Sequence, residues 1–266
     1  MSYRVEPIPA LKDNYIWCLY HTGNHRALVV DPGEAAPVQR FMQEKGLSLD
    51  AILITHHHPD HVAGVKELLG KATVPIYGPS KSSFKGITHP VAEGDRVTWL
   101  DLNFDVVAVP GHTLDHIAFN CTDRPLDHPV SFCGDLLFVC GCGRLFEGSA
   151  EQMRHSLDKL RGLPGDTLIC GGHEYTLANL AFSRTVNPHD EKLQAFESEC
   201  KAMREAGKPT VPTQLGSEKR LNPFLQWDNR TIAQAAVDYG AQAGLTVDPE
   251  NPDQVFAAIR HWKDNF

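Results

Sequence analysis

The sequence predicts an α/β fold in which a body of strands and helices over residues 1–173 precedes a C-terminal α-helical region over residues 174–266. Two observations support this prediction. Short runs rich in β-branched and aromatic residues, which favour strands, recur before residue 173. After residue 174 they give way to longer stretches with the apolar spacing of amphipathic helices. We therefore expect an α/β domain and an α-helical domain, divided at residue 173.

The strands expected in the body are short apolar runs at 15–20, 27–30, 51–54, 74–77, 104–109, 116–119, 130–134 and 166–170. Between them, helical patterns occupy 35–46, 62–70 and 148–162. The last helix is expected to begin with a capping box, because Ser149 stands three residues before Gln152, and to end at Gly162.

Helical patterns account for most of the C-terminal region, at 176–186, 190–207, 230–240 and 252–266. In the second of these, apolar side chains follow one face, and Gly207 is expected to end the helix. The residues on that face are Leu193, Phe196, Cys200 and Met203.

Composition excludes several classes of protein. The net charge of −8 argues against nucleic acid as a partner. No stretch approaches the roughly 20 apolar residues that cross a bilayer, and the first residues show no secretory signal. We expect a cytoplasmic monomer without membrane contact, whose seven cysteines are reduced and mostly buried.

The segment THHHPDH, residues 55–61, places four histidines and an aspartate at the end of a predicted strand. Loops at strand ends are where α/β proteins usually build their sites. His56 and His58 can point the same way on extended backbone, while Asp60 and His61 can approach a second point after the next turn. The spacing therefore indicates two adjacent metal ions. A solvated histidine tract or a tag would instead lie at a terminus.

Three more predicted strands are each followed by glycine and then by a potential ligand: His112, Asp135 and His173. Glycine lets the backbone turn tightly, so the next side chain can reach across the strand ends. Imidazole and carboxylate are the usual ligands of zinc, iron and manganese. These residues and THHHPDH together predict a metal centre, in which His57 is expected to pack or to support a ligand.

The segments HHHPDH, GHT, GD and GHEY, in this order and spacing, resemble the metallo-β-lactamase fold superfamily. A narrower resemblance, to glyoxalase II, the hydroxyacylglutathione hydrolases, is carried by CGCGRLFEGSAEQM, GGHEYTLANLAF, NPFL and RHWKDNF. It extends over the chain from PALKDNYIW, residues 9–17, to Phe266. The resemblance implies a four-layer αββα sandwich as the catalytic domain, residues 1–173, and a C-terminal helical substrate-binding domain, residues 174–266. It also implies a thioester hydrolase of methylglyoxal detoxification, which converts S-D-lactoylglutathione to D-lactate and glutathione.

The resemblance further implies two divalent metal ions, zinc in the first place, with iron or manganese as alternatives. The first ion would be held by His56, His58 and His112, the second by Asp60, His61 and His173, with Asp135 bridging both. A hydroxide would form the other bridge and attack the thioester. Asp60 and Asp135 are thus the expected catalytic residues.

The expected partner is a small-molecule glutathione thioester, and glutathione carries two carboxylates. An acidic chain that binds it needs a local cationic pocket. Arg260 and Lys263 are three residues apart in the last predicted helix and share a face, although such cations are often only solvated. The residues expected to bind substrate are Arg144, Phe146, His173, Tyr175, Arg260 and Lys263.

Three residues depart from the pattern of the family. Asp115 stands where the family usually has glycine, and Leu136 stands where it usually has threonine. Gln226 occupies a position at which many members have a basic residue. None of the three is an expected ligand. An additional carboxylate beside the ligands could alter the metal preference.

Rival functions remain open on the sequence. A lactonase would use a similar pair of metals, and an iron persulfide dioxygenase would use one. A non-enzymatic metal-binding protein would show closed coordination with no open position. A serine hydrolase lacks support, because the chain has no G-x-S-x-G segment.

Overall fold

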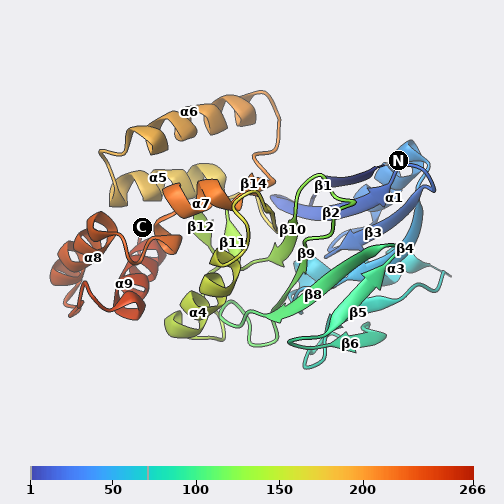
Figure 1. Ribbon diagram of the computed structural model, residues 1–266, viewed down its shortest axis with the longest axis horizontal. Helices are drawn as coiled ribbons and strands as arrows, with labels where there is room; N and C mark the ends of the chain where they lie inside the picture. The colour runs from blue at the N-terminus through green and yellow to red at the C-terminus, as the bar shows by residue number, and fades with distance from the viewer. Residues whose placement is uncertain (1, 71) are drawn as a thin grey trace.

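Figure 1 shows the computed structural model of the chain, which describes residues 2–70 and 72–266. Two mixed six-stranded sheets form its centre. The first contains, in spatial order, β1 (Tyr3–Ala10), β2 (Asn14–His21), β3 (Arg26–Val30), β4 (Ser48–Leu53), β5 (Ile76–Pro79) and β6 (His89–Val91). The second contains β14 (Thr213–Gln214), β13 (Leu168–Gly171), β10 (Val130–Gly134), β9 (Ile117–Cys121), β8 (Leu102–Ala108) and β7 (Arg96–Trp99). A separate hairpin pairs β11 (Leu137–Phe138) with β12 (Gly141–Cys142).

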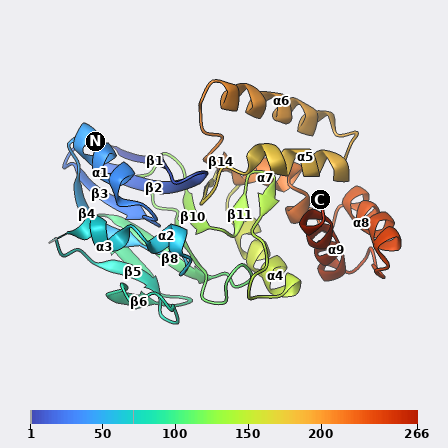
Figure 2. The same ribbon diagram turned by 180° about the vertical axis from the view of Figure 1, so that it is seen from behind.

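Helices lie outside both sheets. The first sheet is accompanied by α1 (Ala35–Lys45), α2 (Pro59–Val62) and α3 (Val65–Leu69), which Figure 2 shows from behind. On the side of the second sheet lie α4 (Ala150–Arg161), α5 (Thr176–Val186), α6 (Glu191–Glu205), α7 (Leu215–Leu221), η1 (Pro223–Leu225), α8 (Arg230–Ala243) and α9 (Pro252–Asp264). The predicted αββα sandwich with a C-terminal helical region is confirmed.

Successive side chains of a strand point to opposite faces of its sheet, so each strand can pack against the other sheet on one face and against helices on the other. In β2, Trp17 and Leu19 join the core between the sheets, which also contains Phe104 and Phe132 of the second sheet. Ile16 lies on the other face of β2, in a cluster with residues of α1.

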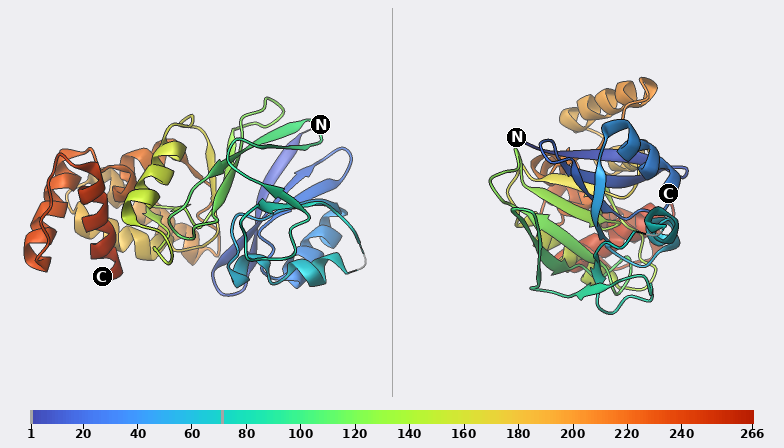
Figure 3. Two further views of the ribbon diagram at one scale, coloured as in Figure 1. Left: turned by 90° about the horizontal axis from the view of Figure 1, so that it is seen from below. Right: turned by 90° about the vertical axis from the view of Figure 1, so that its right-hand side faces the viewer.

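The C-terminal helices do not have a core of their own. One buried cluster combines body residues such as Cys133 and Met153 with Phe182, Phe224 and Phe256 of the C-terminal region. Figure 3 shows these helices gathered beside α4 at one end of the molecule, and α4 contacts α9. The two predicted domains therefore share a hydrophobic core, and their division at residue 173 stays a prediction.

Several local predictions can be compared with this structure. The capping box of α4 is confirmed by hydrogen bonds in both directions between Ser149 and Gln152. The helix expected at 62–70 is instead two short helices, α2 and α3, separated at Gly64, whose amide donates to the carbonyl of Pro32 at 3.0 Å. The seven cysteines are buried free thiols. Within the described residues, no helix combines the length and apolar character needed to span a membrane.

Candidate metal centre

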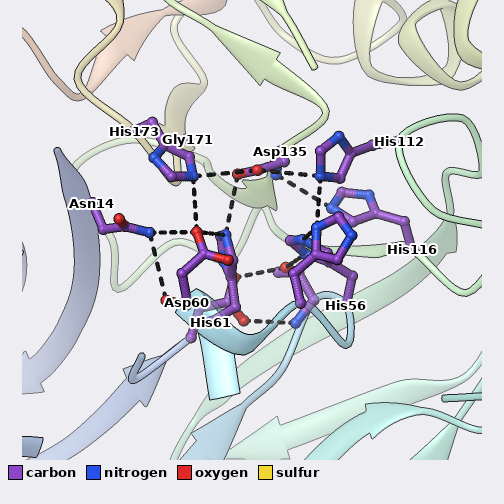
Figure 4. Close-up of polar contacts among 12 residues, drawn as sticks. Asn14, His56, Asp60, His61, His112, His116, Asp135, Gly171 and His173 are labelled. Carbon is purple, nitrogen blue, oxygen red and sulfur yellow. Dashed lines mark hydrogen bonds and ion pairs between the residues drawn. The ribbon is translucent and has the colours of Figure 1, made fainter. Parts of the chain in front are cut away.

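The predicted ligands meet at one edge of the sandwich. The strands β8, β10 and β13 run in the same direction, because β9 is antiparallel to both β8 and β10, and β13 is parallel to β10. Their carboxyl ends therefore lie at the same edge. The end of β4 joins them there, since the amide of Ile117 donates to the carbonyl of Thr55 at 2.9 Å. Figure 4 shows the resulting convergence of side chains from both sheets.

The first group of ligands consists of three imidazoles whose nitrogens face one another. Nδ1 of His58 lies 3.1 Å from Nε2 of His56 and 3.0 Å from Nε2 of His112. Zinc–nitrogen bonds of 2.0–2.1 Å in a tetrahedral site would separate neighbouring ligand atoms by about 3.3 Å. The spacing of the three nitrogens is thus close to that of ligands around one ion.

The second group combines Asp60, His61 and His173. Oδ2 of Asp60 lies 3.5 Å from Nε2 of His61 and 3.4 Å from Nε2 of His173. These three residues form another cluster whose ligand atoms lie within 4.8 Å of one another.

Asp135 stands between the two groups. Its Oδ2 lies 3.3 Å from Nε2 of His112 and 3.3 Å from Nε2 of His173, and its Oδ1 lies 3.4 Å from Nε2 of His61. One carboxylate therefore faces ligands of both groups.

The donor set fits a pair of divalent cations. Nε2 of His61 and Oδ1 of Asp135 are buried and form no hydrogen bond with any residue that the structure describes. Leaving such groups unpaired in the interior costs free energy. A cation between them would satisfy both atoms, and two carboxylates with five imidazoles are the ligands that zinc, iron and manganese accept.

The protonation states of the two groups differ. Burial lowers the pKa of His56, His58 and His112, which favours the neutral imidazole that binds metal. Burial also acts against charged His61, but the neighbouring Asp135 carboxylate outweighs it and raises the pKa of His61. Burial would raise the pKa of Asp135, yet His61 and His173 hold it well below its usual value. Asp135 is therefore ionised, as a ligand must be.

Residues outside the predicted set orient the histidines from their far side. Nδ1 of His61, the ring nitrogen that points away from the other ligands, lies 3.0 Å from Oδ2 of Asp31. Nδ1 of His173 likewise lies 2.9 Å from Oδ1 of Asp13. In His112, Nδ1 lies 2.8 Å from the carbonyl of Arg144. Such contacts fix the tautomer and the orientation of a ligand.

Two further residues support the aspartates, one at a carboxylate and one at a backbone amide. Asn14 donates to Oδ2 of Asp60 at 2.9 Å, and the amide of Asp135 donates to Nε2 of His116 at 3.3 Å (Figure 4). Sequence reasoning missed these supports. Asp13 and Asn14 lie in the family-like segment PALKDNYIW, and His116 lies in GHTLDH, so a signal for three of them was present. Asp31 carried no such signal.

Two glycines are required by close approach. A Cβ atom on Gly172 would lie 2.6 Å from Oδ1 of Asp135 and 2.8 Å from Cε1 of His61. Gly134 has φ of +47°, and its Cβ would lie 2.3 Å from Oγ1 of Thr55. The glycines therefore allow both tight turns and the dense packing of ligands, as the sequence pattern predicted.

A cavity of about 550 Å³ opens over the ligands. His58, Asp60, His112, Asp135 and His173 lie along it. Its walls also include all of the residues predicted to bind substrate: Arg144, Phe146, His173, Tyr175, Arg260 and Lys263. The fold thus brings together two sets of residues that are up to 207 positions apart, from His56 to Lys263.

The aromatic walls contact the ligands directly. The ring of Tyr175 stacks on His173 with centroids 4.6 Å apart and an interplanar angle of 6°. Phe146, which is 62% exposed, meets His58 and His112 edge-on at 5.5 and 5.2 Å. These rings place apolar surface beside the three histidines.

The three cationic side chains of the cavity differ in exposure and in hydrogen bonding. Arg144 is exposed, with Nε 3.5 Å from Oδ1 of Asp264. Nζ of Lys263 donates to the carbonyl of Ala178 at 3.1 Å. Arg260 is only 5% exposed, and its Nη1 donates to the carbonyl of Cys142 at 3.1 Å. Arg260 therefore supports the cavity wall as well as lining it.

The departures from the family pattern have local partners. Oδ1 of Asp115 lies 2.9 Å from Nδ1 of His57 and accepts from the hydroxyl of Thr113 at 2.7 Å. Leu136 is fully buried in the core on the side of the helices. Gln226 is buried and accepts from the side chain of Asn229 at 3.2 Å. None of the three displaces a predicted ligand.

Comparisons with known proteins agree with this geometry. The model of the metallo-beta-lactamase superfamily matches residues 12–173, and the model described as hydroxyacylglutathione hydrolase C-terminus matches residues 174–266. A hydroxyacylglutathione hydrolase of Hahella chejuensis is 47% identical over 260 residues, which cover 98% of each chain.

Solved structures share the fold over most of the chain. ETHE1 from Myxococcus xanthus is similar with a TM-score of 0.64 at 25% identity, covering 99% of this chain and 98% of that one. TTHA1623, solved in a di-iron-bound form, has a TM-score of 0.58 at 25% identity and covers 83% of this chain and 100% of that one. From its sequence over the full length and from its fold, the chain belongs to the hydroxyacylglutathione hydrolase family of the metallo-β-lactamase superfamily.

Proposed function

We propose that the chain hydrolyses S-D-lactoylglutathione to D-lactate and glutathione, with two divalent ions held by the two groups of ligands. The activity of its family is the hydrolysis of hydroxyacylglutathiones. The observation that carries the proposal is the place of Asp135, whose two oxygens face His61 on one side and His112 and His173 on the other. A shared carboxylate of this kind suits a pair of ions and not a single one.

When bound, the two ions would lower the pKa of water to about 7 and stabilise the negative charge that develops on the thioester oxygen. The chain itself holds the reacting groups in place. Asp60 is half-buried at the cavity floor, where Asn14 fixes its Oδ2 atom, so Asp60 is positioned to orient the attacking water. The leaving thiol has an ordinary pKa of about 8.5 and departs as thiolate, so no strong general acid is needed.

The cavity walls match the glutathione moiety. Arg144, Arg260 and Lys263 place positive charge in the cavity of a chain whose net charge is −8. These cations would bind the two carboxylates of glutathione. The exposed rings of Phe146 and Tyr175 would cover its apolar atoms, and the hydroxyl of Tyr175 would bond to its peptide backbone.

Zinc is the ion we propose for both positions, with iron or manganese as the alternatives that the same nitrogen and oxygen ligands accept. The similarity to a protein solved in a di-iron-bound form supports keeping iron under consideration. Elemental analysis of protein purified without added metal identifies the ions.

The decisive experiment combines metal stoichiometry with a thioester assay on the unchanged chain and on Asp135→Ala. We expect two ions per chain and hydrolysis of S-D-lactoylglutathione, with both lost in the variant. Asp166→Ala is the matched control, because this aspartate is exposed and lies outside the cavity. Two ions and full activity in Asp135→Ala would contradict the assignment.

The same measurements, extended to homoserine lactones as substrates, separate the rival functions. One iron per chain would favour a persulfide dioxygenase. Two ions with much faster turnover of homoserine lactones than of glutathione thioesters would favour a lactonase. Bound metal without turnover of any of these substrates would favour a metal-binding protein. Light scattering on the same sample tests the expected monomer.

A further inference from the structure

The hairpin of β11 and β12 is held by side chains of the C-terminal region. Each carbonyl from residue 138 to residue 142 accepts a hydrogen bond from one of them. Asn222 donates to the carbonyls of residues 138 and 141 at 3.3 and 3.0 Å. Asn179, Ser183 and Arg260 donate to those of residues 139, 140 and 142 at 3.1, 3.2 and 3.1 Å, respectively.

The hairpin needs this support. Its strands have only two residues each, and such short strands do not hold a geometry by themselves. Cys140 at its turn has φ of +51°, in the left-handed region that a residue with a side chain rarely adopts. All residues of the turn are buried, so their carbonyls need partners within the protein.

The geometry of the hairpin sets the wall of the substrate cavity. Phe138 and Cys142 line the cavity themselves. The ring of Phe138 meets Tyr175 edge-on at 5.3 Å and His173 at 5.8 Å. Asp135 precedes the hairpin and Arg144 follows it, so a shift of the hairpin would move residues on both sides of the cavity.

Glu218 and Asn222 form the centre of this support. Both are fully buried. Oε2 of Glu218 accepts from the amide of Cys140 at 2.8 Å and from Nδ2 of Asn222 at 3.0 Å, while Oε1 accepts from the hydroxyl of Thr213 at 2.9 Å. Across the described residues, Glu218 forms no ion pair, and neither residue lines the cavity. Their contact with the site is only through the hairpin.

We propose that Glu218 and Asn222 are positioning residues, which fix the β11–β12 hairpin and thereby the shape of the glutathione-binding wall. The proposal rests on the proposed function, because the wall is assigned to glutathione. It gives the C-terminal region a role beyond its own substrate contacts: this region holds the wall that the body contributes.

The test compares Asn222→Ala and Glu218→Gln with Asn229→Ala. Asn229 is the matched control, since both asparagines cap the helix that follows them, at Phe224 and Thr231, but Asn229 lies away from the hairpin. KM for S-D-lactoylglutathione, kcat, metal content and melting temperature are measured for each. KM does not depend on the fraction of folded enzyme, so a loss of stability alone would leave it unchanged.

We expect KM to rise about three- to tenfold in both hairpin variants, as for the loss of one or two hydrogen bonds, with metal content preserved and KM unchanged in Asn229→Ala. If Asn222→Ala does not fold, the KM values of Glu218→Gln and Ser183→Ala test the proposal instead, because each of these variants changes a single contact with the hairpin. Unchanged KM in the folded variants, with only a lower melting temperature, would overturn the proposal.

Amide hydrogen exchange tests the support of the hairpin without any substrate. Amides of residues 137–142 are expected to exchange faster in Glu218→Gln than in Asn229→Ala. If the unchanged chain does not hydrolyse the thioester, the proposed function fails. Faster exchange of the hairpin would still stand as the structural part of the inference, and unchanged exchange would refute that part as well.

Discussion

Oδ2 of Asp31 lies 3.0 Å from Nδ1 of His61, on the side of the imidazole that faces away from Asp135. The same carboxylate accepts from the amide and the hydroxyl of Thr55, at 2.8 and 2.6 Å, and Asp31 is buried. Thr55 begins the segment that carries His56 and His58. One aspartate therefore fixes a ligand of the second group and the backbone that leads to the first.

The first prediction concerns Asp31→Asn. We expect it to weaken metal binding about ten- to hundredfold, because a carboxylate that orients a histidine ligand usually contributes that much. Competition with a chelator of known affinity measures the effect. Asp228→Asn is the control, since this aspartate is paired with Arg161 at the surface. Equal metal affinity in Asp31→Asn and the unchanged chain would contradict the role of Asp31.

The second prediction concerns Gly172→Ala. The added methyl group would lie 2.6 Å from Oδ1 of Asp135 and 2.8 Å from Cε1 of His61, so we expect it to displace these two side chains and to abolish binding of at least one ion. Gly162→Ala is the control, because its Cβ has no neighbour closer than 3.3 Å and its backbone is helical. Elemental analysis compares the two variants. Two ions bound to Gly172→Ala would contradict the close packing.

The sequence predicted most of the fold because hydrophobic periodicity and capping are local signals. The capping box of Ser149 and the apolar face through Leu193 and Cys200 follow from neighbours along the chain. Strand β1 was not anticipated, because two prolines and charged residues interrupt its sequence, YRVEPIPA, as an edge strand allows.

For the site, the sequence predicted the candidate ligands but not the residues that support them. The predicted ligands form a motif of unusual residues, so spacing and resemblance pointed to them together, and the fold brings them into one place. Contacts such as those of Asp31 with His61 and Glu218 with Cys140 join residues 30 and 78 positions apart. Only the folded chain brings such pairs together, and the residue types alone do not mark them.

The third prediction concerns the pH dependence of stability. Burial raises the pKa of Glu218 from 4.5 to about 7, although three hydrogen bonds partly offset it. Since the folded pKa lies above the unfolded one, the stabilisation from protonated Glu218 is complete below pH 4.5 and is lost as pH rises through about 7. We therefore expect the unchanged chain to lose about 2 kcal/mol relative to Glu218→Gln between pH 5 and pH 8.

Denaturant unfolding of both proteins without metal measures this difference, and their shared histidines cancel in the comparison. The prediction fails if the two proteins show parallel stability curves over this range. A difference that grows in the opposite direction would mean that Glu218 is ionised more readily in the folded chain than in the unfolded one.

The last prediction separates the two cations of α9. Nζ of Lys263 donates one hydrogen bond, to the carbonyl of Ala178, and lies over the rings of Phe182 and Phe266. The guanidinium of Arg260, in contrast, is buried and donates to Cys142 and Asp264. Lys263→Ala should therefore raise KM for the glutathione thioester roughly ten- to hundredfold, the effect of one charge-assisted hydrogen bond, with little change in kcat or melting temperature.

Arg260→Ala should raise KM as well, but it should also lower the melting temperature, because it leaves the carbonyl of Cys142 buried without its side-chain donor. Lys201→Ala, on the exposed surface of α6, controls for the loss of one positive charge. Steady-state kinetics at saturating metal and thermal unfolding of the four proteins make the comparison. An unaltered KM in both α9 variants would show that these cations are solvated and do not bind substrate; equal losses of stability in both would contradict the distinction between them.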